Sequence, residues 1–210
     1  MSSTFPFVGD HSFPQFPVRR FTIEEYHRLS EVGLLGEEDR VELLEGLIVP
    51  KMIHKPPHDA AVELGNAALV ARLPPGWRVR IQSAVTTSDS EPEPDLAVVC
   101  GSIRDHAERH PAPHEIALVV EVALSSLAVD RAKAALYARA GIAAYWIVNL
   151  VDEQIEVHED PTGSGPTAFY RRPATFTVAD SVPLVIARTW SRRFPRRNCC
   201  RSGWGHRRCA

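Results

Sequence analysis

The chain has 210 residues, 44% of them hydrophobic, which is enough for one domain with a proper core. Residues 188–210 carry eight arginines and no acid, so residues 1–187 carry 16 basic against 26 acidic side chains and a net charge of −10. This net charge argues against a broad nucleic-acid surface, although it does not exclude local basic patches. No run of 18 apolar residues and no secretory signal is present, so we expect a cytoplasmic protein without membrane segments.

The first part of the chain predicts an arm, a helix and a hairpin. Residues 1–20 carry three prolines and no apolar period, so we expect a flexible N-terminal arm. A capping-box pattern followed by helical apolar spacing predicts a helix over 23–31. Two short apolar runs about a Glu-Gly pair predict a β-hairpin over 41–49. Glu42 lies on its first arm, where a solvent-facing position and a position in a site are equally good interpretations.

A helix and two strands are expected next. Residues 58–73 have helical apolar spacing and end before a Pro-Pro-Gly sequence. Residues 77–87 alternate in the manner of a strand with one wetter face. A segment rich in Pro and Glu then forces extended backbone and places Asp95 at the start of a buried strand over 96–99.

The most informative stretch is 115–122, because its apolar run contains the carboxylate of Glu121. Such a run is typical of a central strand buried on both faces. Burying an isolated carboxylate costs several kcal/mol unless a cation or hydrogen bonds compensate. An acid at the C-terminal end of the strand, where α/β sheets open their ligand crevice, therefore indicates a site.

The remaining elements complete an α/β fold with a mixed central sheet flanked by helices. A helix over 125–140 and a strand over 144–149 follow the acid-bearing strand, in the βαβ pattern that is nearly always right-handed. Tyr145 and Trp146 are expected in the core. Later antiparallel strands are expected over 154–158, 169–171 and 175–178.

The last residues, 188–210, change in character and predict an irregular Arg/Cys-rich tail, which leaves 21–187 as the one domain. Either a basic tail or a change of reading frame near the 3′ end accounts for this composition. The cysteines form no disulfide framework. Four tail residues offer zinc-type donors but match no usual spacing: Cys199, Cys200, His206 and Cys209.

Asp95 lies at the start of one strand and Glu121 near the end of another, and we expect these two strands to be adjacent. Two carboxylates about 4 Å apart repel by about 4 kcal/mol at an effective dielectric of 20, so they favour a cation between them. Oxygen donors favour Mg²⁺ or Mn²⁺, with the backbone carbonyl of Val122 as a further ligand. Lys133 on the next helix would orient the attacking water and stabilise phosphoryl charge, and Glu42 would be a third carboxylate. This set predicts metal-assisted phosphodiester hydrolysis.

Each candidate also has an interpretation without catalysis. Asp95 can be a turn acid after proline, Glu121 half of a buried ion pair, and Lys133 an exposed helix residue. We interpret His58, which follows two prolines, as a surface histidine. Gln82 has only weak support as a residue of the cleft.

Six segments occur in a fixed order: RFTIEEYHRLSEVGLL, RVELLEGLIV, EPDLAVV, LVVEV, K-x-x-x-Y-A-x-x-G and AYWIVNL. This order resembles the Uma-two family of restriction-endonuclease-like proteins, in the PD-(D/E)XK nuclease superfamily, over roughly residues 20–187. The resemblance implies a restriction-endonuclease-like fold, a metal-dependent endonuclease activity with Mg²⁺ or Mn²⁺, DNA as the substrate and a homodimer.

The resemblance also assigns site residues. Asp95 and Glu121 match the two acids of the family motif. Lys133 matches its lysine, because Ala123 stands two places after Glu121. Glu42 is the better match for the hairpin acid, since the turn lacks the usual Asp-Gly-Glu. The alternative is a catalytically inactive module that binds nucleic acid or a protein partner through the same cleft.

Overall fold

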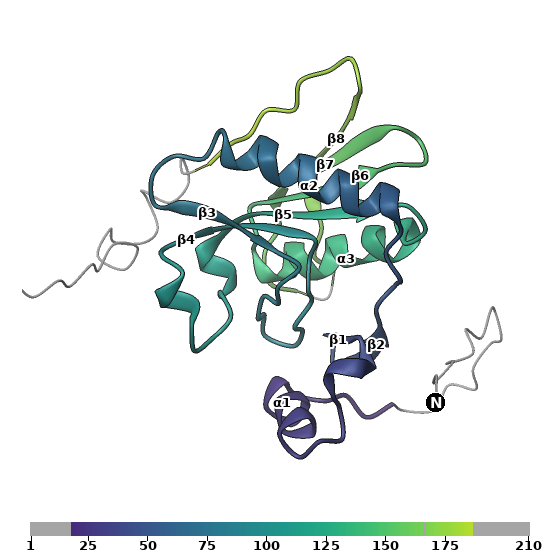
Figure 1. Cartoon of the computed structure of the whole chain (residues 1–210), viewed down its shortest axis with the longest axis vertical. Helices are drawn as coiled ribbons and strands as arrows, with labels where there is room; N and C mark the ends of the chain where they lie inside the picture. The colour runs from purple at the N-terminus through teal and green to yellow at the C-terminus, as the bar shows by residue number, and fades with distance from the viewer. Residues whose placement is uncertain (1–17, 166, 187–210) are drawn as a thin grey trace, which may run out of the picture.

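The computed structural model describes residues 18–165 and 167–186, and its elements are shown in Figure 1. The expected arm over 1–20 lies outside the described residues except for its last three positions. The expected tail over 188–210 lies wholly outside them, together with Cys199, Cys200, His206 and Cys209. No helix in the described part is long and apolar enough to cross a membrane.

A six-stranded mixed sheet forms the centre of the fold, in the order β3-β4-β5-β6-β7-β8. Only β5 and β6 run parallel, and the other neighbours are antiparallel. The parallel pair is joined through α3, because parallel neighbours need a long crossover. The bounds are β3 Trp77–Ile81, β4 Leu96–Cys100, β5 Ile116–Ala123, α3 Leu127–Ala140, β6 Ala144–Asn149, β7 Gln154–Pro161 and β8 Tyr170–Thr177.

Helices cover both faces of the sheet (Figure 1). On one face, α2 (Pro56–Val70) packs Val62 and Leu69 against side chains of β4 and β5. On the other face, α3 packs Leu136 and Tyr137 into a second apolar cluster. Every residue of β4 and β5 is buried, as expected for central strands covered on both sides. Since side chains alternate along a strand, Glu121 follows Val119 onto the α3 face.

A small N-terminal unit lies at one end of the molecule, where α1 (Ile23–Glu31) accompanies the hairpin of β1 (Val41–Leu44) and β2 (Leu47–Pro50) (Figure 1). The expected capping box of α1 is present, with Thr22 and Glu25 bonding reciprocally. The hairpin is fastened to the main body, because the Glu91 N–H donates to the Leu43 carbonyl at 2.7 Å. This attachment brings β1 beside the segment that leads into β4.

Several predicted boundaries were wrong. The first strand of the sheet ends at Ile81 instead of continuing to residue 87, because Gln82 turns into the left-handed region with φ +43°. The helix expected over 58–73 spans Pro56–Val70, since prolines are well suited to a first helical turn. The strands expected over 169–171 and 175–178 form one strand, β8, through Pro173. Pro173 has no backbone N–H to donate. An edge strand such as β8 tolerates this, because no further strand pairs with its outer side.

Gly46→Ala is expected to lower the free energy of unfolding by about 2–4 kcal/mol. Gly46 has φ +75°, and a Cβ there would lie 2.6 Å from Arg20 Cβ and 2.9 Å from the Phe21 carbonyl oxygen. Gly33 has the same φ of +75° but open space around it, so Gly33→Ala tests the backbone strain alone and should cost about 1 kcal/mol. Urea unfolding of both variants measures the difference, and equal losses would contradict the steric argument.

Candidate functional site

A cavity of about 480 Å³ opens where the ends of β4 and β5 meet the hairpin and the first turns of α2 and α3. Its buried ionisable lining is strongly acidic. Four carboxylates face one ammonium and one imidazole: Glu42, Asp95, Glu121 and Asp130 with Lys133 and His58. An excess of buried negative charge of this kind favours the binding of a cation.

Antiparallel pairing of β4 with β5 brings Asp95 and Glu121 together. Leu96 is opposite Val120, so the residue before β4 comes beside the end of β5. The Asp95 N–H donates to Glu121 Oε2 at 3.3 Å, and the Val122 N–H donates to Asp95 Oδ2 at 2.8 Å. The expected adjacency of the two strands is confirmed. Val122 lines the cavity, and its N–H orients Asp95.

Lys133 joins Glu121 to the hairpin. Its Nζ lies 3.1 Å from Glu121 Oε1 and 2.8 Å from Glu42 Oε1. The other oxygen of Glu42 accepts the Glu93 N–H at 3.1 Å. Lys133 is 8% exposed and Glu42 4% exposed, so the interpretations of an exposed lysine and a solvent-facing Glu42 are wrong. The packing of β1 against the segment before β4 removes Glu42 from water.

Tyr137 is a contact that the sequence did not indicate. The ring of this α3 residue lies in the core. Its hydroxyl also donates to Glu121 Oε1 at 3.1 Å, one helical turn after Lys133. Glu121 Oε1 therefore receives two donors from α3, and these fix the orientation of the carboxylate.

Burial dominates the electrostatics of the site. It raises the pKa of Glu121 to about 8, an effect that Lys133 opposes and the neighbouring acids reinforce. Burial also raises the pKa of Asp130, which accepts a hydrogen bond from Ser126 at 2.5 Å. Burial acts to lower the pKa of Lys133, but the neighbouring carboxylates of Glu121 and Glu42 have the larger effect, so the pKa of Lys133 is raised. Lys133 thus stays protonated and can act as a cationic donor, not as a base.

The prediction of a surface position for His58 was wrong. The imidazole is 7% exposed, and its Nε2 lies 3.1 Å from Asp95 Oδ2. His54 stacks on it, with ring centroids 4.2 Å apart, and its Nδ1 lies 3.0 Å from the amide nitrogen of Gln82. Gln82 is itself exposed and reaches Asp95 Oδ1 at 3.5 Å. Two histidines four residues apart, close to the helix start, were the sequence signal that the prediction did not use.

The donor set fits a divalent cation. One atom each of His54, His58 and Asp95 lies within 4.8 Å of the other two, and Glu121 hydrogen-bonds the backbone of Asp95. Carboxylate oxygens suit Mg²⁺ and Mn²⁺, while imidazole nitrogens shift the preference toward transition metals. Asp95 is common to both donor groups, so it is the residue around which a cation would be held.

Comparisons with known proteins bear on the family and the fold of the chain. A comparison of the sequence with curated proteins gave no match. A crystal structure from Anabaena variabilis, named as a "putative nuclease belonging to DUF820", superposes with a TM-score of 0.62 at 17% identity, covering 79% of this chain and 89% of that chain. At this identity the likeness supports the nuclease-like α/β fold. The profile of the Uma2 family, described as "Putative restriction endonuclease", matches residues 23–191, and the chain therefore belongs to this family.

Proposed function

We propose that the protein is an endonuclease that hydrolyses phosphodiester bonds in DNA with Mg²⁺ or Mn²⁺. The observation that carries the proposal is the convergence of the buried residues Asp95, Glu121 and Lys133 in one cavity. Membership of the Uma2 family and the fold shared with a protein named as a "putative nuclease" support the same activity.

Each residue has a definable part in this reaction. Asp95 and Glu121 would hold the ion, with the carbonyl of Val122 and the imidazole of His58 as further ligands. When bound, Mg²⁺ or Mn²⁺ would acidify a water and offset negative charge on the phosphoryl group. Lys133 remains charged, so it can orient that water and stabilise the transferring phosphoryl group. Glu42 holds the ammonium in place from the hairpin side, at 2.8 Å.

A plasmid assay tests the proposal. The purified chain is incubated with supercoiled DNA in MgCl₂, MnCl₂ or EDTA, and the topological forms are separated on a gel. Nicking or linearisation with Mg²⁺ or Mn²⁺ but not with EDTA is the expected result. Binding of DNA without cleavage in either ion would favour the catalytically inactive module, which the acidic body of the chain makes the main rival.

His58→Ala is expected to lower the affinity for Mn²⁺ by about 10- to 100-fold and the affinity for Mg²⁺ by less. The variant removes the imidazole at 3.1 Å from Asp95 but leaves every carboxylate of the cavity in place. Because imidazole donors favour Mn²⁺ over Mg²⁺, the ratio of the affinity for Mn²⁺ to the affinity for Mg²⁺ should be smaller in His58→Ala than in the wild type. Isothermal titration with each ion measures this.

His114→Ala, at an exposed position of the 3₁₀ helix Pro113–Glu115, is the control and should bind both ions as the wild type does. Equal losses for Mn²⁺ and Mg²⁺ in His58→Ala would show that the imidazole only supports the shape of the site.

A further inference from the structure

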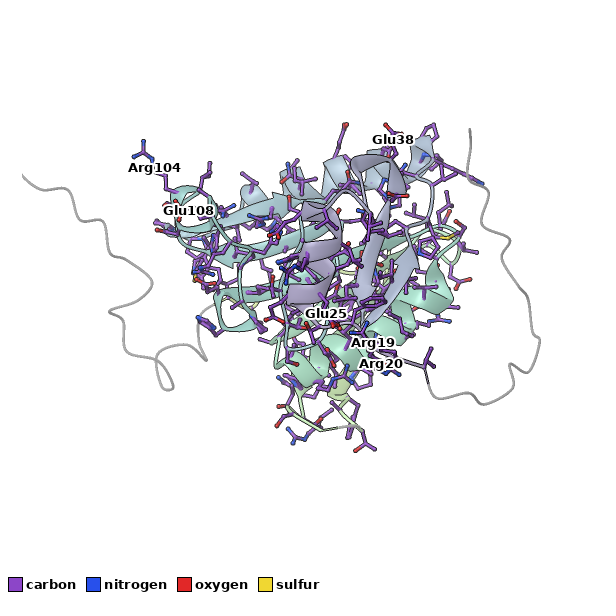
Figure 2. The ribbon with its side chains drawn as sticks, turned by 90° about the horizontal axis from the view of Figure 1, so that it is seen from below. Arg19, Arg20, Glu25, Glu38, Arg104 and Glu108 are labelled. Carbon is purple, nitrogen blue, oxygen red and sulfur yellow. The ribbon has the colours of Figure 1, made fainter. Side chains whose placement is uncertain are left out.

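A second cavity, of about 710 Å³, lies beside β3 and shares no lining residue with the acidic one. One wall is the loop between β4 and β5, from which Arg104 and Glu108 project at one end of the molecule (Figure 2). Its basic lining residues are His27, Arg80, His106, Arg109 and His110. This lining contrasts with the acidic body of the chain.

Two arginines on β3 carry buried N–H groups without partners. Arg78 and Arg80 lie opposite Val99 and Ala97 of β4, so they share the α3 face of the sheet. The Nε atom of each is buried and has no hydrogen-bond partner in the part of the chain that the structure describes. A guanidinium is always charged, and burying its N–H groups unpaired costs free energy. The fold therefore holds positive charge here that its own side chains leave incompletely satisfied.

Arg80 is the less compensated of the two. Burial lowers its pKa, and the neighbouring Arg78 lowers it further, with no described carboxylate acting against them. Burial also lowers the pKa of Arg78, but Asp105 partly opposes this. Arg109, by contrast, makes two contacts of 2.6 Å with Glu115 and is neutralised. The charge available to an incoming anion is mainly that of Arg80.

One of the two neighbouring histidines adds a further donor. Arg80 Nη2 lies 3.5 Å from His110 Nδ1, and Arg78 Nη2 lies 2.8 Å from His106 Nδ1. Because a guanidinium only donates, each Nδ1 must accept and each neutral ring carries its proton on Nε2. Burial lowers the pKa of His106 and of His110, which favours these neutral rings. His110 thus offers an N–H donor beside Arg80, and Glu108, an exposed side chain, is the acid among the lining residues.

We propose that this second cavity binds a phosphate group, with Arg80 as its anchor and His110 as a supporting donor. A guanidinium matches two phosphate oxygens at once, and such charge-assisted pairs satisfy N–H groups that water reaches poorly. The phosphate can belong to a nucleic-acid backbone, away from the bond that is cut, or to a free phosphate. Only the first source rests on the proposed nuclease function, because binding itself requires no metal and no cleavage.

Thermal unfolding of the full chain in EDTA tests the binding. Sodium phosphate is compared with NaCl at equal ionic strength, so that general screening is the same. The melting temperature of the wild type is expected to be at least about 2 °C higher in phosphate than in NaCl. This increase should reach a plateau as the phosphate concentration rises. Arg80→Gln should lose the shift. Arg72→Gln, which removes an exposed arginine of the same charge just after α2, should keep it.

A second result separates an anion site from a purely structural role. Without phosphate, Arg80→Gln should melt at or above the wild-type temperature, because it removes a poorly compensated, half-buried charge. A marked loss of stability without phosphate, or an equal phosphate shift in wild type and Arg80→Gln, would overturn the proposal. The absence of any phosphate-specific shift in the wild type would overturn it as well.

A DNA-binding arm in EDTA identifies the source of the phosphate. If the group is a backbone phosphate, Arg80→Gln should weaken binding of a short DNA duplex about five- to tenfold. The slope of the logarithm of the binding constant against the logarithm of the salt concentration should fall by about one, as expected for the loss of one phosphate contact. Unchanged DNA affinity with a lost phosphate shift would assign the site to a free phosphate. Both readouts are independent of cleavage, so failure of the nuclease proposal and failure of this one are distinguishable.

Discussion

Replacement of Glu121 by glutamine is expected to reduce metal-dependent cleavage by at least about 10³-fold, which corresponds to about 4 kcal/mol of transition-state stabilisation. The amide keeps the shape of the side chain and an oxygen that can accept the bond now made by Tyr137 at 3.1 Å. It cannot supply negative charge to a cation. The loss should therefore appear in cleavage rates and in metal titrations, with the fold preserved.

Stability supplies a second signature of the same substitution. Burial raises the pKa of Glu121 to about 8 in the folded protein, whereas an unfolded chain releases this proton near pH 4.5. Between these values the folded state holds more protons, so this group makes the wild type less stable as the pH rises from 4.5 to 8. Glu121→Gln lacks this titration and should gain stability relative to the wild type over that range. Urea unfolding at pH 5 and pH 8 measures the change.

Metal binding should also depend on the protonation state of Glu121. An ion held by Glu121 must displace the proton, so the affinity of the wild type for Mn²⁺ is expected to rise with pH up to about 8. Titration calorimetry in two buffers of different ionisation enthalpy detects the released proton. Glu63→Gln, at an exposed position of α2, is the control for loss of one acid. Cleavage that survives in Glu121→Gln would remove Glu121 from the metal site.

The sequence was sufficient for the central strands β4, β5 and β6 because the signal there is local. Continuous apolar runs marked β4, β5 and β6, and the acid inside one of them stood out because burial of a carboxylate needs a compensating partner. The neighbouring positions of Asp95 and Glu121 followed from strand order. The capping box and the helix over 23–31 were likewise readable from adjacent residues.

The rest of the site depends on contacts between distant segments, which local spacing does not encode. His58 is buried because α2 places it against Asp95, 37 residues later. Glu42 is buried because the segment before β4 closes over the hairpin, where Glu91 bonds to Leu43. A helix position such as Lys133 reads as exposed until the partner surface is known. Periodicity identified which elements form, whereas packing decided which of their polar side chains meet.

Replacement of Lys133 by methionine is expected to lower the free energy of unfolding by about 3–5 kcal/mol, because it leaves Glu42 and Glu121 buried without their cation. The loss should be smaller at pH 5 than at pH 8, since burial raises the pKa of Glu121 to about 8 and this carboxyl group is then protonated. Lys133 itself stays charged across this range, because the carboxylates raise its pKa in the folded state. Urea unfolding at both pH values measures the effect.

Two further variants show that the buried charge is the cause. Arg171→Met removes an exposed cation of β8, whose partner Asp160 is also exposed, and should change stability little at either pH. Adding Glu42→Gln to Lys133→Met should recover part of the lost stability, because one unpaired carboxylate is then neutral. A Lys133→Met loss as small as that of Arg171→Met, or one independent of pH, would mean that removal of the lysine leaves no buried negative charge. The cavity would then lack the negative charge on which cation binding depends.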